Sequence, residues 1–335
     1  MRGMTESKAP LNSIAFIGFG EAGRAFLDGW RSNPHFKARV SAYDIKTDSP
    51  DRQVRAAKRA DYAAANVLGA SSAPEALAGA GAIFSVVTAD QAHQAALAAL
   101  AGLTPGALFF DCNSCAPQTK AETAAEVEAA GGRYVDVAVM APVRPRLHRT
   151  PLLISGPHAE AAAGALEALE MSAGIHHGPV GSCSAVKMVR SIMMKGLEAL
   201  VCECVLAGHK AGVIETVLDS LDETYPGFDW KKRSAYMLER MMTHGRRRAA
   251  EMREVALTVD LLGLESAMSC AAADWQQTIG DLSLRSTEDE AVDFRALAEK
   301  ILARLSPGHS APTAVSANPI RSSTQTSEKL TSESG

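Results

Sequence analysis

The sequence predicts an α/β protein whose N-terminal part is a doubly wound parallel sheet and whose C-terminal part is all helical. Three observations predict this fold class. A short apolar strand, a glycine turn and a helix follow one another at residues 13–31. Apolar segments of strand length then alternate with helical segments as far as residue 181, as parallel sheets require. From residue 182 to 305 helical periodicity dominates, with scarcely a strand signal.

The first strand, 14–17, runs into the glycine-rich sequence G-F-G-E-A-G. Gly18 permits a tight turn, Gly20 lets the backbone approach a pyrophosphate, and Gly23 lets the following helix pack on the strand. The helix N-terminus presents free N–H groups to phosphates. A second strand, 38–43, ends in Asp44, at about the separation expected of an acid that binds the ribose. A glycine-rich turn in an ordinary α/β unit would leave both flanking features as coincidences.

We therefore predict a Rossmann-type domain that binds NAD. Asp44 favours NAD over NADP, because its carboxylate can accept hydrogen bonds from a ribose 2′-hydroxyl and would repel a 2′-phosphate. Lys46, Arg52 and Arg55 nearby weaken this preference. Thr88, at the end of the fourth strand, could border the nicotinamide or be a plain strand-end residue. The predicted cofactor residues are Gly18, Phe19, Gly20, Glu21, Ala22, Gly23, Asp44 and Thr88.

The remaining elements follow in order. Strands are expected at 66–68, 83–88, 108–111, 134–140, 152–155 and 175–176, and helices at 91–101, 118–130 and 159–171. The segment 184–211 is long enough to be one helix across the domain junction. We expect a flexible N-terminus at 1–12, a dinucleotide-binding domain at 13–181 and a helical substrate and dimerisation domain at 182–305. The segment 306–335, rich in Ser, Thr and Pro, is expected to be a disordered tail.

Composition excludes several classes of partner. The chain has 335 residues, 47% of them hydrophobic, and a net charge of −4, which gives no electrostatic reason to expect nucleic acid or an anionic membrane. No signal peptide is evident and no apolar run approaches the ~20 residues of a membrane span, so we expect a cytoplasmic protein. Six cysteines in such a chain indicate reduced thiols rather than a disulfide framework.

A lysine stands in the first turns of the long helix, in the run G-S-C-S-A-V-K at 181–187. If Lys187 faces a cleft, desolvation would lower its pKa toward a range useful for proton transfer. Taken alone, a solvated helix lysine is the more ordinary interpretation. Lys195 and Glu198 are spaced to pair along the same helix and are interpreted as scaffold.

Three segments together resemble the β-hydroxyacid dehydrogenases related to 6-phosphogluconate and 3-hydroxyisobutyrate dehydrogenases. They are the G-F-G-E-A-G turn, the loop D-C-N-S-C-A-P at 111–117, and G-S-C-S-A-V-K-M-V-R-S at 181–191. The resemblance covers roughly residues 13–215 and implies a dehydrogenase with Lys187 as its general acid/base. Within the family the chain is similar to a subgroup whose C-terminal part is a domain of unknown function, marked here by K-G-L-E-A-L and H-G-R-R-R-A-A-E-M.

The chain departs from the family pattern where the substrate would bind. Arg190 and Ser191 stand where two asparagines are usual, and Met140-Ala141-Pro142 stands where Ser-Gly-Gly is usual. These differences leave the identity of the hydroxy acid open. An imine or enamine reductase on the same frame, or a non-catalytic dinucleotide sensor, is the alternative function, although related imine reductases usually lack the lysine.

The predicted substrate residues come from three places. Asn113 and Ser114 follow a strand end and can donate hydrogen bonds to a carboxylate or hydroxyl. Arg190 and Ser191 lie on the long helix. The basic cluster supplies His244, Arg246 and Arg247, which could equally form a solvated face.

No metal site is predicted, because Cys112 and Cys115 have neither a second pair nor a suitably spaced histidine. We also expect a homodimer, because apolar residues flank the basic cluster at helical spacing: Met237, Leu238, Met241, Met242, Met252, Val255, Val259 and Leu262.

Overall fold

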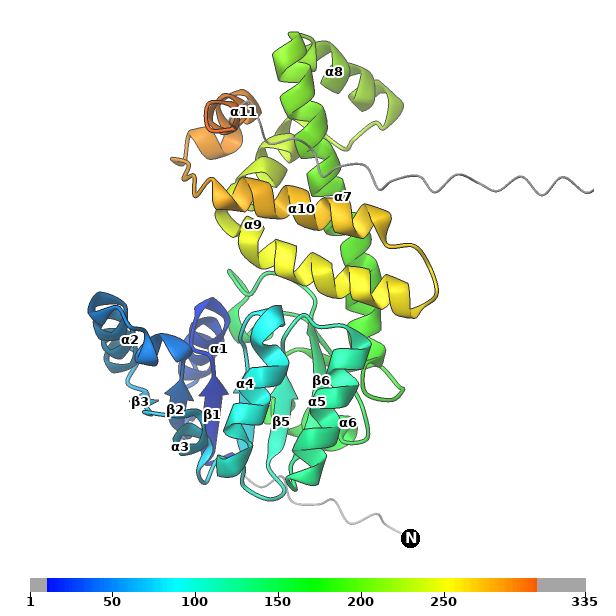
Figure 1. Ribbon diagram of the computed structural model, residues 1–335. Helices are drawn as coiled ribbons and strands as arrows, with labels where there is room; N and C mark the ends of the chain where they lie inside the picture. The colour runs from blue at the N-terminus through cyan, green and yellow to red at the C-terminus, as the bar shows by residue number, and fades with distance from the viewer. Residues whose placement is uncertain (1–10, 306–335) are drawn as a thin grey trace, which may run out of the picture.

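The computed structural model describes residues 11–305. An eight-stranded sheet with helices on both faces is followed by a purely helical region, which confirms the predicted fold class (Figure 1). The strand order is β3-β2-β1-β4-β5-β6-β7-β8. The strands are β1 (Ser13–Ile17), β2 (Arg39–Tyr43), β3 (Leu68–Gly69), β4 (Ala82–Ser85), β5 (Leu108–Asp111), β6 (Arg133–Val139), β7 (Leu152–Ser155) and β8 (Ala173–Ile175).

The sheet is mostly parallel, with one antiparallel pair that the sequence pattern did not indicate. β6 and β7 pair antiparallel, with Asp136 opposite Ser155. The residues between them, 140–151, hold only a short 3-10 turn, η4 (Leu147–Arg149), and no crossover helix. A parallel pair needs a crossover connection, so a chain that returns without one must run back in the opposite direction.

Helices cover both faces of the sheet. On one face α1 (Glu21–Arg31), α2 (Arg52–Ala64) and α6 (Ala159–Ala168) pack against side chains such as Phe16 and Phe84. On the other face α3 (Ala73–Leu77), α4 (Ala92–Ala99) and α5 (Pro117–Ala129) pack against side chains such as Ile83 and Phe109. Side chains of neighbouring strand residues thus point to opposite faces of the sheet. Both faces are buried, as expected for strands that are apolar along nearly their whole length.

The aromatic core anchors the strand from which the glycine turn begins. Phe16 stacks on Trp30 of α1 with ring centroids 5.5 Å apart, and Phe84 stacks on Phe110 at 4.6 Å. All four side chains are fully or almost fully buried. Because buried aromatic rings contribute large apolar areas, these contacts fix β1 and α1 relative to the rest of the sheet. Short 3-10 turns η1 (Ile45–Asp48), η2 (Ala89–Gln91), η3 (Leu100–Gly102) and η5 (Glu290–Val292) join other elements.

The helical region consists of α7 (Ser182–Ala211), α8 (Ile214–Thr224), α9 (Trp230–Leu261), α10 (Ala267–Asp281) and α11 (Phe294–Leu302). The long helix α7 rises from the sheet domain into the helical region, and α9 crosses above the end toward which β1 and β2 point (Figure 1). In the described part of the chain, no helix is long and apolar enough to cross a membrane.

The apolar residues around the basic cluster pack inside the helical region itself. We expected these side chains to be left exposed for a partner subunit to cover, and this expectation is wrong for all but one of them. Leu262 is 64% exposed, whereas each of the other seven is at most 8% exposed (Met237, Leu238, Met241, Met242, Met252, Val255 and Val259). They fill two cores between α7, α8, α9, α10 and α11. The reason is that α9 is covered by α7 and α10 of the same chain, which the sequence periodicity of α9 alone cannot reveal.

Candidate functional site

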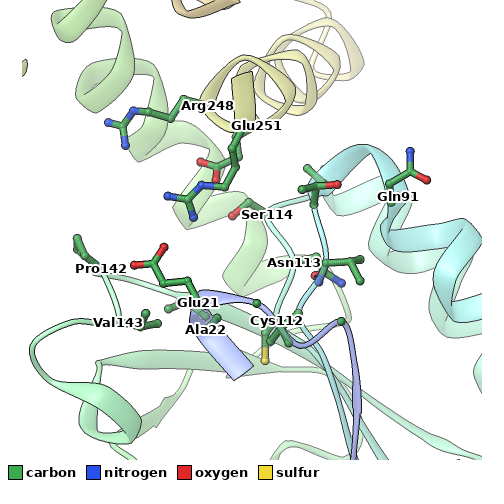
Figure 2. A pocket seen from close by; sticks show the side chains of 18 of the residues that line it. Glu21, Ala22, Gln91, Cys112, Asn113, Ser114, Pro142, Val143, Arg248 and Glu251 are labelled. Carbon is green, nitrogen blue, oxygen red and sulfur yellow. The ribbon is translucent and has the colours of Figure 1, made fainter. Parts of the chain in front are cut away.

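A cavity of about 850 Å³ lies between the carboxyl ends of the central strands and the helices α7 and α9. In an open α/β sheet this edge is where ligands bind. Figure 2 shows its walls: Glu21 and Ala22 come from the start of α1, Asn113 and Ser114 from the loop after β5, and Arg248 and Glu251 from α9. The cavity therefore has a sheet-domain wall and a helical wall.

The glycine turn has the geometry that a pyrophosphate requires. Gly18 has φ +81°, and a Cβ there would lie 2.8 Å from the backbone oxygen of Val86, so only glycine fits. Gly20 caps α1 with no side-chain hydrogen bond, and a Cβ there would meet nothing within 4 Å. The first N–H groups of α1 are thus uncapped and the backbone before them borders open space. This arrangement fits a dinucleotide phosphate group.

Asp44 lies in the cavity wall and also fixes the glycine turn. Its Oδ2 accepts a hydrogen bond from the Phe19 backbone N–H at 2.9 Å, and its Oδ1 accepts one from Lys46 N–H at 3.0 Å. Lys58 Nζ lies 3.7 Å from the carboxylate and donates to Phe19 O at 2.8 Å. The position expected for the ribose acid is therefore tied to the turn expected to hold the pyrophosphate.

Most of the predicted cofactor residues line the cavity, but two do not. Phe19 is fully buried, with its ring against Phe16 and Tyr62. Gly23 is also buried, and a Cβ there would lie 3.3 Å from the Phe19 ring, so its role is to let α1 approach β1 closely. The six that line the cavity are Gly18, Gly20, Glu21, Ala22, Asp44 and Thr88.

The loop after β5 contains one satisfied polar side chain and one without a partner. Asn113 is 3% exposed, and its amide is fully engaged: Oδ1 accepts from Val87 N–H at 2.7 Å, and Nδ2 donates to Ser85 Oγ and Asp111 Oδ1. Ser114 lines the cavity and forms no hydrogen bond with another described residue. Asn113 thus orders the ends of β4 and β5, while Ser114 is available to a ligand.

A buried ionic network beneath this loop was missed by the sequence reasoning. Lys120 of α5 is fully buried, and its Nζ lies 3.0 Å from Asp111 Oδ1 and 3.6 Å from Asp136 Oδ1. Although burial opposes its charge, the two carboxylates raise the pKa of Lys120. Asp136 in turn accepts hydrogen bonds from Ser184 Oγ at 2.6 Å and from Gly181 N–H at 3.0 Å. The network therefore fixes the N-terminus of α7. Its only signal in the sequence was an acidic residue on each of two strands, Asp111 and Asp136, that prove to be adjacent in the sheet.

Lys187 lies one turn beyond this anchored end of α7 and lines the cavity. Burial lowers the pKa of Lys187 to about 8, with Lys195 and Lys120 acting in the same direction and Glu251 opposing them. A lysine with such a pKa exchanges protons readily near neutral pH.

Two ion pairs join α7 to α9 on the helical wall. Lys195 Nζ lies 2.9 Å from Glu251 and donates to Ser191 Oγ at 3.0 Å, and Arg248 binds Glu198 through both ends of its guanidinium. Lys195 and Glu198, interpreted as a pair along one helix, thus each pair across to α9 instead. Burial alone would raise the pKa of Glu251, but Lys195, Arg247 and Lys187 together outweigh this effect and hold the pKa at about 2.

The basic cluster of α9 divides between two sides of the helix. Arg247 lines the cavity, whereas Arg246 extends to α10, where its Nε donates to Asp281 at 2.7 Å. His244 is half-buried outside the cavity lining, and burial together with neighbouring arginines lowers its pKa to about 4. Arg190 and Ser191 of α7 line the cavity with Arg247, although Ser191 Oγ already accepts from a lysine.

Close packing of two glycines sets this division. A Cβ on Gly245 would lie 2.3 Å from the backbone oxygen of Gln276, and one on Gly280 would lie 2.5 Å from the backbone nitrogen of Arg246. α9 and α10 therefore approach with almost no side-chain volume between them at this point. That contact fixes the rotation of α9, so Arg246 faces α10 while Arg247 faces the cavity.

The cysteines of the loop after β5 are free and buried, and burial raises the pKa of Cys112 to about 12. Such a thiol stays protonated and is a poor nucleophile or ligand. Among residues 11–305, no group of three or more His, Cys, Asp or Glu side chains could hold a metal ion.

Comparisons with known proteins bear on the same regions. Residues 13–181, about half of the chain, match the sequence profile of the NAD binding domain of 6-phosphogluconate dehydrogenase, and residues 208–279 match a domain of unknown function, DUF1932. No curated protein matches the chain significantly.

Solved structures with the same fold include proteins with and without an assigned activity. A conserved hypothetical protein from Sinorhizobium meliloti is 34% identical with a TM-score of 0.66, covering 89% of this chain and 98% of that one. A conserved protein of unknown function, described as structurally similar to 3-hydroxyacid dehydrogenases, is 26% identical with a TM-score of 0.58, covering 80% and 97%. The 3-hydroxyisobutyrate dehydrogenase of Mycobacterium tuberculosis shares the fold at 18% identity and a TM-score of 0.62, covering 87% and 99%.

Proposed function

The chain belongs to the 6-phosphogluconate dehydrogenase-like family, and from this premise we propose that it is an NAD-dependent oxidoreductase acting on a hydroxy acid. The single observation that carries the proposal is Lys187. A desolvated lysine with a pKa of about 8 borders the same cavity as the glycine turn and an acid placed to bind a ribose. Within residues 11–305 Lys187 forms no hydrogen bond or ion pair, so a structural role gives no reason for its burial at that place.

The residues of this chain divide the work of catalysis. The nicotinamide, when bound, supplies the acceptor or donor of the hydride. Neutral Lys187 accepts the hydroxyl proton of the substrate at Nζ during oxidation, and charged Lys187 returns it to the carbonyl oxygen during reduction. Ser114 donates a hydrogen bond to the substrate, and Arg190, one turn beyond Lys187, binds its acid group.

We propose NAD rather than NADP as the preferred cofactor. Asp44 places a carboxylate in the cavity wall at the end of β2, where it would accept hydrogen bonds from the ribose and repel a 2′-phosphate. The Asp44 carboxylate already binds two backbone N–H groups, which hold its orientation. Lys46 in the same wall is the countervailing charge.

A purified protein assayed for NADH formation at 340 nm across a panel of hydroxy acids tests the activity. Turnover of at least one hydroxy acid, lost in Lys187→Met, is the expected result. Reduction of imines without any hydroxy-acid oxidation would support the imine reductase alternative. Binding of NADH with no turnover in either panel would support the sensor.

We also propose a homodimer formed by the helical region. The exposed faces of α7 and α10 carry large apolar side chains, among them Val189 (53% exposed), Met193 (69%), Leu200 (58%) and Met268 (72%). Covering such side chains removes apolar surface from water. Light scattering should give a dimer mass at micromolar concentration, and Met193→Asp should shift it toward a monomer. A monomeric wild type would contradict the dimer.

A further inference from the structure

Three arginine side chains in the cavity form no ion pair with an acidic side chain in the described part of the chain. Arg190, Arg240 and Arg247 all line it, and none forms a hydrogen bond or ion pair with another residue in the range 11–305. Arg247 lies near enough to Glu251 to help lower the pKa of that carboxyl, but Glu251 forms its ion pair with Lys195. The Nε of Arg240 is buried and without a hydrogen-bond partner. The two glutamates of this wall are already taken, one by Lys195 and the other by Arg248.

The helical wall of the cavity is strongly positive although the chain as a whole has a net charge of −4. It carries six basic side chains and two acidic ones, namely Lys187, Arg190, Lys195, Arg240, Arg247 and Arg248 against Glu198 and Glu251. On the opposite wall, Glu21 forms no ion pair with any described residue. Guanidinium groups stay charged at every physiological pH, so this concentration of charge favours a bound anion.

The arginines lie at different distances from the proposed proton carrier. Arg190 follows Lys187 by three residues, so the two side chains are neighbours on one face of α7. Arg247 lies on α9, one turn before the glutamate that pairs with Lys195. Arg240 is a further two turns back along α9, roughly 10 Å along the helix axis. The positive charge therefore extends away from Lys187 instead of surrounding it.

We propose that the substrate is a hydroxy acid that carries a second acid group, remote from the reacting carbon. This inference rests on the proposed function of the site. Arg190 binds the carboxylate nearer to the reacting carbon, and Arg247 and Arg240 bind the second acid group, a carboxylate or a phosphate-type group. A substrate with one acid group would occupy Arg190 and leave two cavity guanidiniums without an anion. Arginine suits both kinds of acid because its planar fork binds either through two hydrogen bonds.

Binding of unreactive anions to the NADH-loaded protein tests this without requiring turnover. Calorimetry would compare the diacids succinate, glutarate and adipate with butyrate, valerate and hexanoate, and with 4-phosphonobutyrate. The best diacid or the phosphonate should bind at least about tenfold more tightly than any monoacid, as expected for one added charged hydrogen bond. Which of the two binds better identifies the second acid group.

Neighbouring arginines supply a matched pair of variants. Arg247→Gln should weaken the best diacid or the phosphonate by about tenfold to a hundredfold while leaving the monoacids unchanged. Arg246→Gln changes the same residue type one position away, where the guanidinium binds Asp281 outside the cavity, and should bind every probe as wild type does. Equal affinity for diacids, phosphonate and monoacids, or equal behaviour of the two variants, would overturn the inference.

The two proposals fail separately. A preference for doubly acidic anions without hydride transfer from any hydroxy acid to the nicotinamide would refute the oxidoreductase and keep the anion site. Hydride transfer from hydroxy acids with one acid group, with no gain in binding from a second acid group, would keep the oxidoreductase and refute the second acid group.

Discussion

The pH dependence of hydride transfer should report Lys187 directly. With its pKa at about 8, Lys187 is mostly protonated at pH 7 but has a substantial neutral fraction. A solvated lysine with a pKa near 10.4 would be neutral about 230 times less often at that pH, so burial greatly increases the fraction of Lys187 that can accept a proton. kcat/KM for oxidation should therefore rise with pH and level off above about 8, and kcat/KM for reduction should fall there.

Two substitutions separate proton transfer from charge. Lys187→Met removes the proton carrier and should lower kcat/KM by about 10²- to 10⁴-fold and abolish the inflection near pH 8. Lys187→Arg keeps a positive charge in the cavity but cannot release a proton, so it should lose oxidation as severely. Both variants should bind NADH as wild type does, measured by fluorescence titration. A Lys187→Met enzyme with wild-type turnover would refute the mechanism.

The same lysine should cost stability, and the sign follows from its lowered pKa. Folding disfavours the charged form, so the cost is fully present below about pH 8 and is relieved as pH rises toward the unfolded value. The shift corresponds to about 3 kcal/mol as an upper limit. Lys187→Met should therefore raise the melting temperature at pH 7, and this gain should shrink as pH rises from 8 to 10. An unchanged or lowered melting temperature would show that Lys187 is not desolvated.

Three other predictions address the neighbouring groups. Gly18→Ala should lower the melting temperature, because φ is +81° and the added Cβ would lie 2.8 Å from a backbone oxygen. Gly20→Ala adds a Cβ with nothing within 4 Å, so it should keep the melting temperature of wild type and weaken NADH binding. Equal melting temperatures of the two variants would contradict this. Wild type should prefer NAD to NADP by at least about tenfold in kcat/KM. Asp44→Asn should reduce this preference, because it removes the charge that repels a 2′-phosphate. Equal kcat/KM with the two cofactors in wild type would contradict the role of Asp44. Glu251→Gln should shift the pH profile of oxidation to lower pH, because the Glu251 carboxylate raises the pKa of Lys187; an unshifted or alkaline-shifted profile would show that the two groups do not interact.

The sequence was sufficient where function depends on local backbone geometry. Gly18 and Gly20 follow an apolar strand, and Asp44 ends the next one, so the order of residues alone placed them at the carboxyl edge of adjacent parallel strands. The alternation of strands and helices likewise predicted the doubly wound sheet, because the spacing of apolar residues along the chain differs between a buried strand and a half-buried helix. Lys187 was found through a family resemblance, and the structure adds its desolvation.

The tertiary structure alone decided which polar side chains are free to bind a ligand. We predicted Asn113 as a hydrogen-bond donor for a substrate, yet its side-chain amide already forms hydrogen bonds with Val87, Ser85 and Asp111. Val87 and Ser85 lie 26 and 28 positions away in the sequence. Lys120 of α5 is fully buried between two carboxylates from different strands, Asp111 and Asp136. Such partners meet only when strands far apart in the sequence pair, so no local pattern contains them.

The same limit applies to the run of three arginines on α9. Consecutive residues of a helix point about 100° apart, so at most part of the run can face one cavity, but the sequence does not say which part. The choice is made by the contact of Gly245 with Gly280, which fixes the rotation of α9 against α10. Composition thus determined that arginines are present near the site, and helix packing determined that Arg247 faces the cavity while Arg246 binds Asp281.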